Sequence, residues 1–211
     1  MTLFLPFFFG FLSAVVGVIP PGLINMTAAK VGITDGRKRA MMFVLGATII
    51  VFLQTYISVM FAQYINQHEE IVVLFREIGL GIFMALSIYF LFFAKEPKIN
   101  PQEKLQLKSK RSRFFMGMLI SALNFFPIPY YVFISVTLAS YKLFNFETSS
   151  TYSLVFGIVF GSFFVFYCYV LFFEKLKSRT EYLIKNMNKF IGIVTGIVAL
   201  ITLVNVLKFY F

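Results

Sequence analysis

The stretch VIPPGLINMTAAK, residues 18–30, interrupts an apolar run that begins almost at the first residue. It contains two adjacent prolines, Pro20 and Pro21, followed by Gly22. These are poor residues for a helix interior, because proline lacks the N–H donor and glycine loses more backbone entropy than other residues. The stretch therefore predicts a break in an apolar helix, and the composition around it shows what kind of protein contains that helix.

The composition is that of a membrane protein. The chain has 211 residues, of which 59% are hydrophobic and 13% charged, and its mean hydropathy is +0.85. A soluble domain carries about twice that share of charged residues. A transmembrane helix needs about 20 mostly apolar residues. We therefore predict an all-α polytopic membrane protein with six transmembrane helices, at about 3–28, 40–65, 71–94, 114–138, 152–173 and 190–207.

The basic residues lie mostly on one side of the predicted membrane. Of the 19 Lys and Arg residues, 16 fall in the first, third and fifth connections between spans. Cytoplasmic loops are enriched in Lys and Arg, so both termini should be outside. The charge of +10 does not indicate nucleic-acid binding, because topology and anionic lipid explain basic residues in short loops beside spans.

A basic linker at 95–113 divides the chain into two halves, 1–94 and 114–211, with three predicted spans each. Two related units with an odd number of spans must insert in opposite senses, which is the inverted repeat of many secondary transporters. We therefore predict such a repeat.

The two halves break in corresponding spans. The first span breaks at the prolines before Asn25, and the fourth breaks at SALNFFPIPYY, residues 121–131, which contains Asn124, Pro127 and Pro129. Proline leaves carbonyls one turn upstream without their backbone donors, and in hydrocarbon these must be paired with protein, water or a solute. Matching broken spans indicate a central binding site. The alternative is that the prolines only shape helix packing.

These residues resemble the LysE-type amino-acid exporters. The Pro-Gly-Pro signature that ends the first span of that family corresponds to Pro21-Gly22, and its glycine-spaced basic loop corresponds to DGRKRAMMFVLG, residues 35–46. The family's Asn-Pro signature corresponds to Asn124 with Pro127 displaced. The resemblance covers essentially the whole chain and implies a bacterial inner-membrane exporter of amino acids, coupled to protons.

Three positions depart from the family pattern. Leu23 stands in place of the second proline of the signature, the lysine that usually follows Asn-Pro is absent, and Ile50-Val51 occupy the position of a Gly-Asp pair. The chain is therefore a divergent relative by its motifs.

The candidate site lies at the two breaks. A half-helix beginning near Gly22 or Pro129 would direct N–H groups and its positive dipole end toward a carboxylate. Amides such as Asn25 and Asn124 both donate and accept, which suits a zwitterion. The alternative for these amides, and for Thr48, Gln54 and Thr55, is interhelical hydrogen bonding. The candidate substrate-binding residues are Pro21, Gly22, Asn25, Thr48, Gln54, Asn124, Pro127 and Pro129.

The middle of every predicted span lacks Asp, Glu, Lys, Arg and His. A basic substrate would need a buried carboxylate, so a neutral amino acid is favoured over a basic one. The same pattern removes the usual proton carrier, and Asp35 is a weak candidate for coupling, with a solvated loop residue or a helix cap as the alternative. Neither a metal site nor an enzyme is expected, since His68 and Cys168 are the chain's single residues of their types.

The glycines leave a second function open. Gly157 with Gly161 and Gly192 with Gly196 form GxxxG pairs, which mark either a dimer face or packing within one bundle. The leading prediction is a secondary transporter that exports a small amino acid or related metabolite by alternating access. The alternative is a membrane scaffold that binds partner helices through these glycines. The expected partners are a small-molecule substrate and the lipid bilayer, without nucleic acid or cofactor, and a homo-oligomer is left open.

Overall fold

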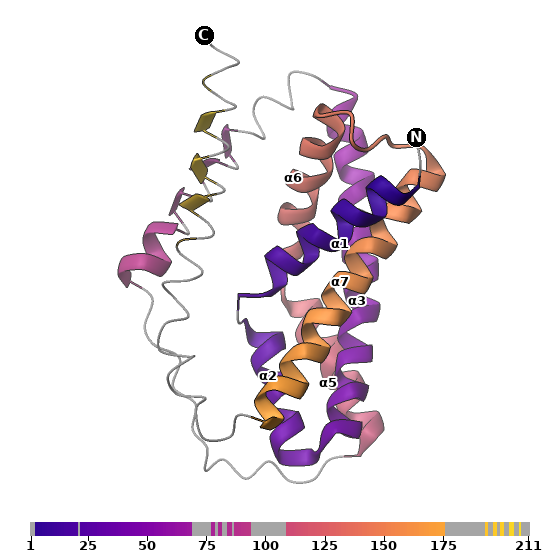
Figure 1. The fold of residues 1–211 in the computed structure, drawn as a ribbon, viewed down its shortest axis with the longest axis vertical. Coiled ribbons are helices and arrows are strands. Elements are labelled where there is room, and N and C mark those ends of the chain that lie inside the picture. The colour runs from indigo at the N-terminus through magenta and orange to yellow at the C-terminus, as the bar shows by residue number, and fades with distance from the viewer. Residues whose placement is uncertain are drawn as a thin grey trace. The chain divides into compact units, whose positions relative to one another are not determined.

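The computed structural model describes residues 3–20, 22–68 and 109–175, together with 77–78, 80–81, 84–85, 87–93 and a few helical residues between 193 and 207 (Figure 1). The regular elements in these ranges are all helical, which confirms the predicted all-α class. They are α1 (Phe4–Val18), α2 (Leu23–Asp35), α3 (Arg37–Asn66), a π-helical turn η1 (Tyr89–Phe93), α5 (Lys110–Leu123), α6 (Pro127–Ser140) and α7 (Thr148–Lys175).

Two of these helices, α3 and α7, are each long and apolar enough to cross a membrane. The pairs α1 with α2 and α5 with α6 would each cross as one broken span, bent by 76° and 64°. The described helices therefore account for two to four spans, and both broken pairs fall where the prolines predict them. Half of the residues in the predicted spans at 71–94 and 190–207 lie outside the described residues.

The first span is longer than the predicted 3–28, because α2 continues to Asp35. Gly36 follows in the left-handed region with φ of 87°, and α3 begins at the next residue. A side chain is strained in that conformation, so glycine permits this one-residue joint between α2 and α3. The chain therefore reverses without a loop.

The start of α5 lies inside the predicted linker 95–113. The Ser109 hydroxyl accepts a hydrogen bond from the Ser112 backbone N–H at 3.1 Å, which caps the helix before Lys110. Arg113 is consequently a helical residue in the first turn of α5. The linker residues 95–108 lie outside the described residues.

The chain forms two compact units in space. The first consists of residues 1–63 and 100–178 and contains α1, α2, most of α3, α5, α6 and α7. The second consists of residues 64–99 and 179–211, and within it Gly196 approaches the Ser87 side chain closely. Each unit draws on both of the sequence halves predicted as 1–94 and 114–211.

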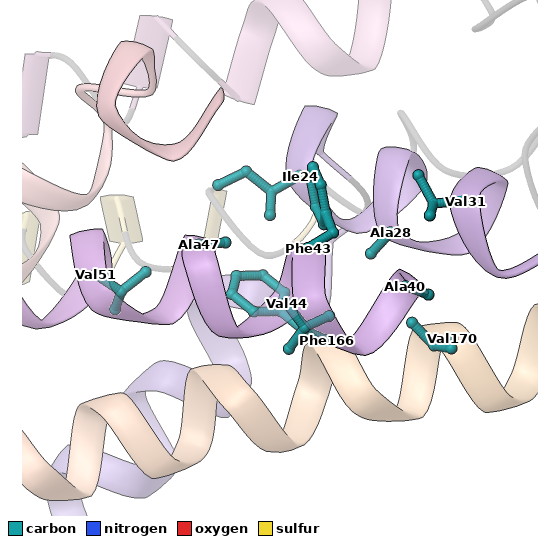
Figure 2. Close-up of a cluster of buried hydrophobic side chains, with 10 residues drawn as sticks. All are labelled: Ile24, Ala28, Val31, Ala40, Phe43, Val44, Ala47, Val51, Phe166 and Val170. Carbon is teal, nitrogen blue, oxygen red and sulfur yellow. The ribbon is translucent and has the colours of Figure 1, made fainter. Parts of the chain in front are cut away.

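An apolar core holds α2 against α3 and α7 in the first unit. Figure 2 shows its side chains interleaving from the three helices. The buried side chains are Ile24, Ala28 and Val31 from α2, Ala40, Phe43, Val44, Ala47 and Val51 from α3, and Phe166 and Val170 from α7. The small alanines let the α2 and α3 backbones approach, while Phe43 and Phe166 fill the remaining space.

Helices α1 and α7 touch through glycine. A Cβ atom added to Gly10 would lie 2.5 Å from the Leu154 carbonyl oxygen, and one added to Gly157 would lie 2.2 Å from the Phe7 carbonyl oxygen. Real Cβ contacts are never so short, so only glycine permits this approach.

Helices α3 and α5 touch in the same way. A Cβ atom on Gly46 would lie 2.1 Å from the Phe114 carbonyl oxygen, and one on Gly117 would lie 2.0 Å from the Phe43 carbonyl oxygen. In both helix pairs, the carbonyl that a glycine approaches belongs to the residue three positions before the glycine of the other helix. The first helix of each broken pair is thus joined to a long helix by one reciprocal pattern.

We predict that Gly117→Ala lowers the free energy of unfolding by about 1–3 kcal/mol, because the added methyl group collides with backbone rather than with a flexible side chain. Leu119→Ala is the control, since Leu119 lies on the same helix and is exposed. Thermal unfolding of both purified variants and the wild type measures the difference. Equal midpoints for Gly117→Ala and the wild type would contradict the predicted contact.

Candidate functional site

The first break leaves the carbonyls at the end of α1 without helical donors, and Asn25 pairs with two of them. Its amide Nδ2 donates to the Val18 carbonyl at 2.6 Å and to the Pro20 carbonyl at 3.0 Å. The carbonyl between them, of Ile19, accepts from the Tyr169 hydroxyl of α7 at 2.6 Å. Side chains from α2 and α7 therefore hold the broken backbone.

The second break is held in a similar way by α3. The Gln54 amide Nε2 donates to the Ser121 carbonyl at 3.1 Å and to the Asn124 carbonyl at 2.9 Å. Gln54 is buried, and both accepting residues lie at the end of α5, where Asn124 adopts an extended conformation. The structure thus brings together two of the predicted site residues, Gln54 and Asn124.

Several polar atoms near the second break have no partner. The Gln54 Oε1 atom and the Ser121 hydroxyl are buried without a hydrogen bond, and so is the Thr55 hydroxyl beside Gln54 in the sequence. Because Nε2 is used by two carbonyls, Oε1 must be an acceptor and can pair only with a donor. Leaving such groups unpaired in a dry interior costs about 1–3 kcal/mol each, so they are candidates for binding a polar solute.

The other predicted site residues lie near the start of a helix or bond within their own helix. Gly22 is the extended residue before α2, which begins without a side-chain cap. The Thr48 hydroxyl donates to the Val44 carbonyl of its own helix at 2.8 Å. Pro127 opens α6, so this half-helix begins two residues before Pro129, and Pro129 itself is exposed. Pro21 lies outside the described residues.

A buried ion pair joins α2 to α5 at the end of the unit that carries Arg37, Lys38, Arg39, Lys110, Arg111 and Arg113, which we call the basic end. The Arg113 Nε atom donates to the Asp35 Oδ2 atom at 2.6 Å, and both side chains are 0% exposed. Asp35 is therefore neither a solvated loop residue nor an N-terminal helix cap, which corrects the alternative reading of the sequence.

The Asp35 carboxylate is held by two donors. Arg113 Nε donates to Oδ2 at 2.6 Å and the Thr34 hydroxyl donates to Oδ1 at 3.0 Å, while Arg39 donates to the Asp35 backbone carbonyl. A coupling role for Asp35 stays a prediction.

Sequence reasoning missed Arg113, which it counted only as one of the basic residues that set orientation. The signal that was available is its spacing from Gly117 and Ser121, since residues four apart share a helix face. All three are buried on α5. Within the part of the chain that the structure describes, no three His, Cys, Asp or Glu side chains gather as a metal site requires.

We predict that Gln54→Leu destabilises the protein by about 1–3 kcal/mol, because the Ser121 and Asn124 carbonyls lose their shared donor. Thr48→Val in the same helix should change the free energy of unfolding much less, since its hydroxyl bonds only its own helix. Denaturation of the purified variants distinguishes the two. A Gln54→Leu protein as stable as Thr48→Val would show that the second break does not need Gln54.

The comparison with known proteins agrees with the resemblance found in the motifs. The family model described as LysE type translocator matches residues 15–205. No curated protein matches the chain, and no solved structure does. With its apolar helices, the matched region is that of a multi-pass membrane transporter. Because the match spans most of the sequence, the chain belongs to the LysE type translocator family.

Proposed function

We propose that this protein is a secondary transporter that exports a small neutral amino acid or a related metabolite across the bacterial inner membrane. The observation that carries the proposal is the pair of broken spans in a translocator-family chain, with the freed carbonyls held by Asn25, Tyr169 and Gln54. Breaks of this kind are tolerated in a membrane where they are buried in protein or line a water-filled cavity, and in secondary transporters they form the substrate site.

The substrate-binding residues in this proposal are those of the two breaks. The unpartnered Gln54 Oε1 atom and Ser121 hydroxyl would accept hydrogen bonds from a substrate ammonium group. The uncapped start of α2 at Gly22 would receive the carboxylate, because the first N–H groups of a helix point toward its N-terminus. The start of α6 offers fewer such donors, since Pro127 and Pro129 have no N–H.

Two observations support alternating access by an inverted repeat. The reciprocal glycine contacts join α1 to α7 and α5 to α3, as expected when the first and fourth spans, and the second and fifth, are related by a two-fold axis. Each break is also held from a long helix, by Tyr169 of α7 for the first and by Gln54 of α3 for the second. Rocking of one repeat against the other would expose the breaks to each side in turn.

The proposed orientation places the basic end in the cytoplasm and both chain termini outside. The Asp35–Arg113 pair brings the start of α5 beside the joint between α2 and α3, so the first and third connections share one side. The Ser153 hydroxyl donates to the Leu3 carbonyl, which brings the starts of α1 and α7 together. The Lys and Arg residues at the basic end favour a cytoplasmic location for that end.

The scaffold alternative depended on free glycine faces. Gly157 and Gly161 pack on α1 of the same chain, at Phe7 and Phe11, so they are not available to a partner helix. Gly196 meets Ser87, and Gly192 lies outside the described residues. We therefore propose transport rather than assembly.

The test is amino-acid release from bacterial cells that lack their own exporters and are fed dipeptides. Cells expressing the protein should release one or two neutral amino acids faster than cells carrying an empty vector. Release of none, with the protein folded and in the membrane, would overturn amino-acid export. Release of a basic amino acid would contradict the neutral substrate.

We predict that Asn124→Leu reduces the export rate at least about tenfold while the protein stays folded, because Gln54 bonds the Asn124 backbone carbonyl and not its side chain. Leu123→Ala is the matched control, since Leu123 is the exposed neighbour. Export rates are compared at equal amounts of protein in the membrane. Unchanged export by Asn124→Leu would remove this side chain from the site.

A further inference from the structure

The Asp35–Arg113 pair contributes less to stability than its short distance suggests. Its side chains are completely withdrawn from solvent, and removing two charges from water costs about as much as their attraction returns. A well-packed apolar pair would hold α2 to α5 at least as well. The pair therefore calls for a role beyond holding the fold.

The Arg113 guanidinium is only partly used by Asp35. Its Nε atom donates to Asp35, its Nη1 atom meets the weak acceptor Sδ of Met116 at 3.1 Å, and its buried Nη2 atom has no partner. The Nε and Nη2 N–H groups lie side by side on one edge, which suits the two oxygens of a carboxylate. Asp35 occupies only half of that edge.

Arg39 adds a second cation to the same place. Its Nη1 atom donates to the Asp35 backbone carbonyl at 3.0 Å, and its Nε atom is buried without a partner. One guanidinium group thus contacts the Asp35 carboxylate and the other its backbone carbonyl, and each retains an unused N–H donor. Asp35, Arg39 and Arg113 together carry a net charge of +1, which favours the binding of an anion.

The position of this cluster connects it to both breaks. Asp35 ends α2, which follows the first break, and Arg113 lies in the first turn of α5, which precedes the second break. Asp35 comes from the first predicted half, and Arg113 lies at the end of the predicted linker, on the helix that continues into the second half. Movement of one half against the other would therefore separate the pair.

We propose that Asp35, Arg39 and Arg113 form a second substrate site at the basic end, which takes the zwitterion of an amino acid before it reaches the breaks. The substrate carboxylate occupies the Nε and Nη2 edge of Arg113, its ammonium group pairs with Asp35, and the internal ion pair opens. This inference rests on the proposed export of amino acids. It adds a class requirement, since the substrate must carry a free carboxylate.

The test is binding to the purified full-length chain in detergent. A panel of neutral amino acids, each beside its amide, which lacks the carboxylate, is titrated while the thermal unfolding midpoint is followed. At least one amino acid should raise the midpoint of the wild type, and its amide should not. An amide that raises the midpoint as strongly as its amino acid would overturn the carboxylate requirement.

Three variants separate binding from folding. The double variant Asp35→Asn with Arg113→Gln removes both charges, so no unpaired charge remains buried, and it should weaken binding at least about tenfold. Arg113→Lys keeps the charge but loses the two parallel N–H donors of the guanidinium group, so it should also weaken binding. It provides the test if the double variant does not fold. Lys110→Gln, at an exposed neighbouring position, should bind as the wild type does.

The outcomes distinguish this site from the proposed function. Wild-type binding that persists unchanged in the double variant or in Arg113→Lys would overturn the basic-end site and leave amino-acid export standing. No response of the wild type to any amino acid would count against both.

Discussion

The rest of the structure depends on one constraint: a carbonyl freed where a helix breaks in an apolar environment must find a hydrogen-bond donor. The first break satisfies it with Asn25 and Tyr169, and the second with Gln54. These donors come from α2, α7 and α3, so each break is tied to a helix that runs past it. The breaks are therefore fixed points of the bundle rather than loose loops, which is what a site for a small polar solute requires.

The long helices can reach the breaks only because the bundle is closely packed. Without the contacts at Gly10, Gly157, Gly46 and Gly117, α1 would stand away from α7 and α5 from α3. Helix association in lipid depends on such close approach, because lipid chains are as apolar as leucine and provide no hydrophobic driving force. Packing and polar capping thus support each other, since Gln54 meets Ser121 and Asn124 along the same contact between α3 and α5 that Gly46 and Gly117 permit.

Much of this arrangement could be predicted from the sequence, because it follows from residues with strong local effects. Pro20 and Gly22 predict the first break, Pro127 the second, and the apolar runs predict α3 and α7. The pairing partners could not be predicted in this way. Gln54 and Asn124 are 70 positions apart, and Asp35 and Arg113 are 78 apart, so only the folded chain brings them together. A basic residue before a span is read as a loop residue, although Arg113 is buried.

The joint at Gly36 determines how the first unit can deform. It places a single residue between Asp35, the end of α2, and Arg37, the start of α3. The core formed by Ile24, Ala28, Phe43 and Val44 holds the two helices together along their length. They therefore form one packed pair, and α3 carries Gln54 from this joint to the second break. The Asp35 end of α2 and the second break are thus connected by a single continuous helix rather than by a loop.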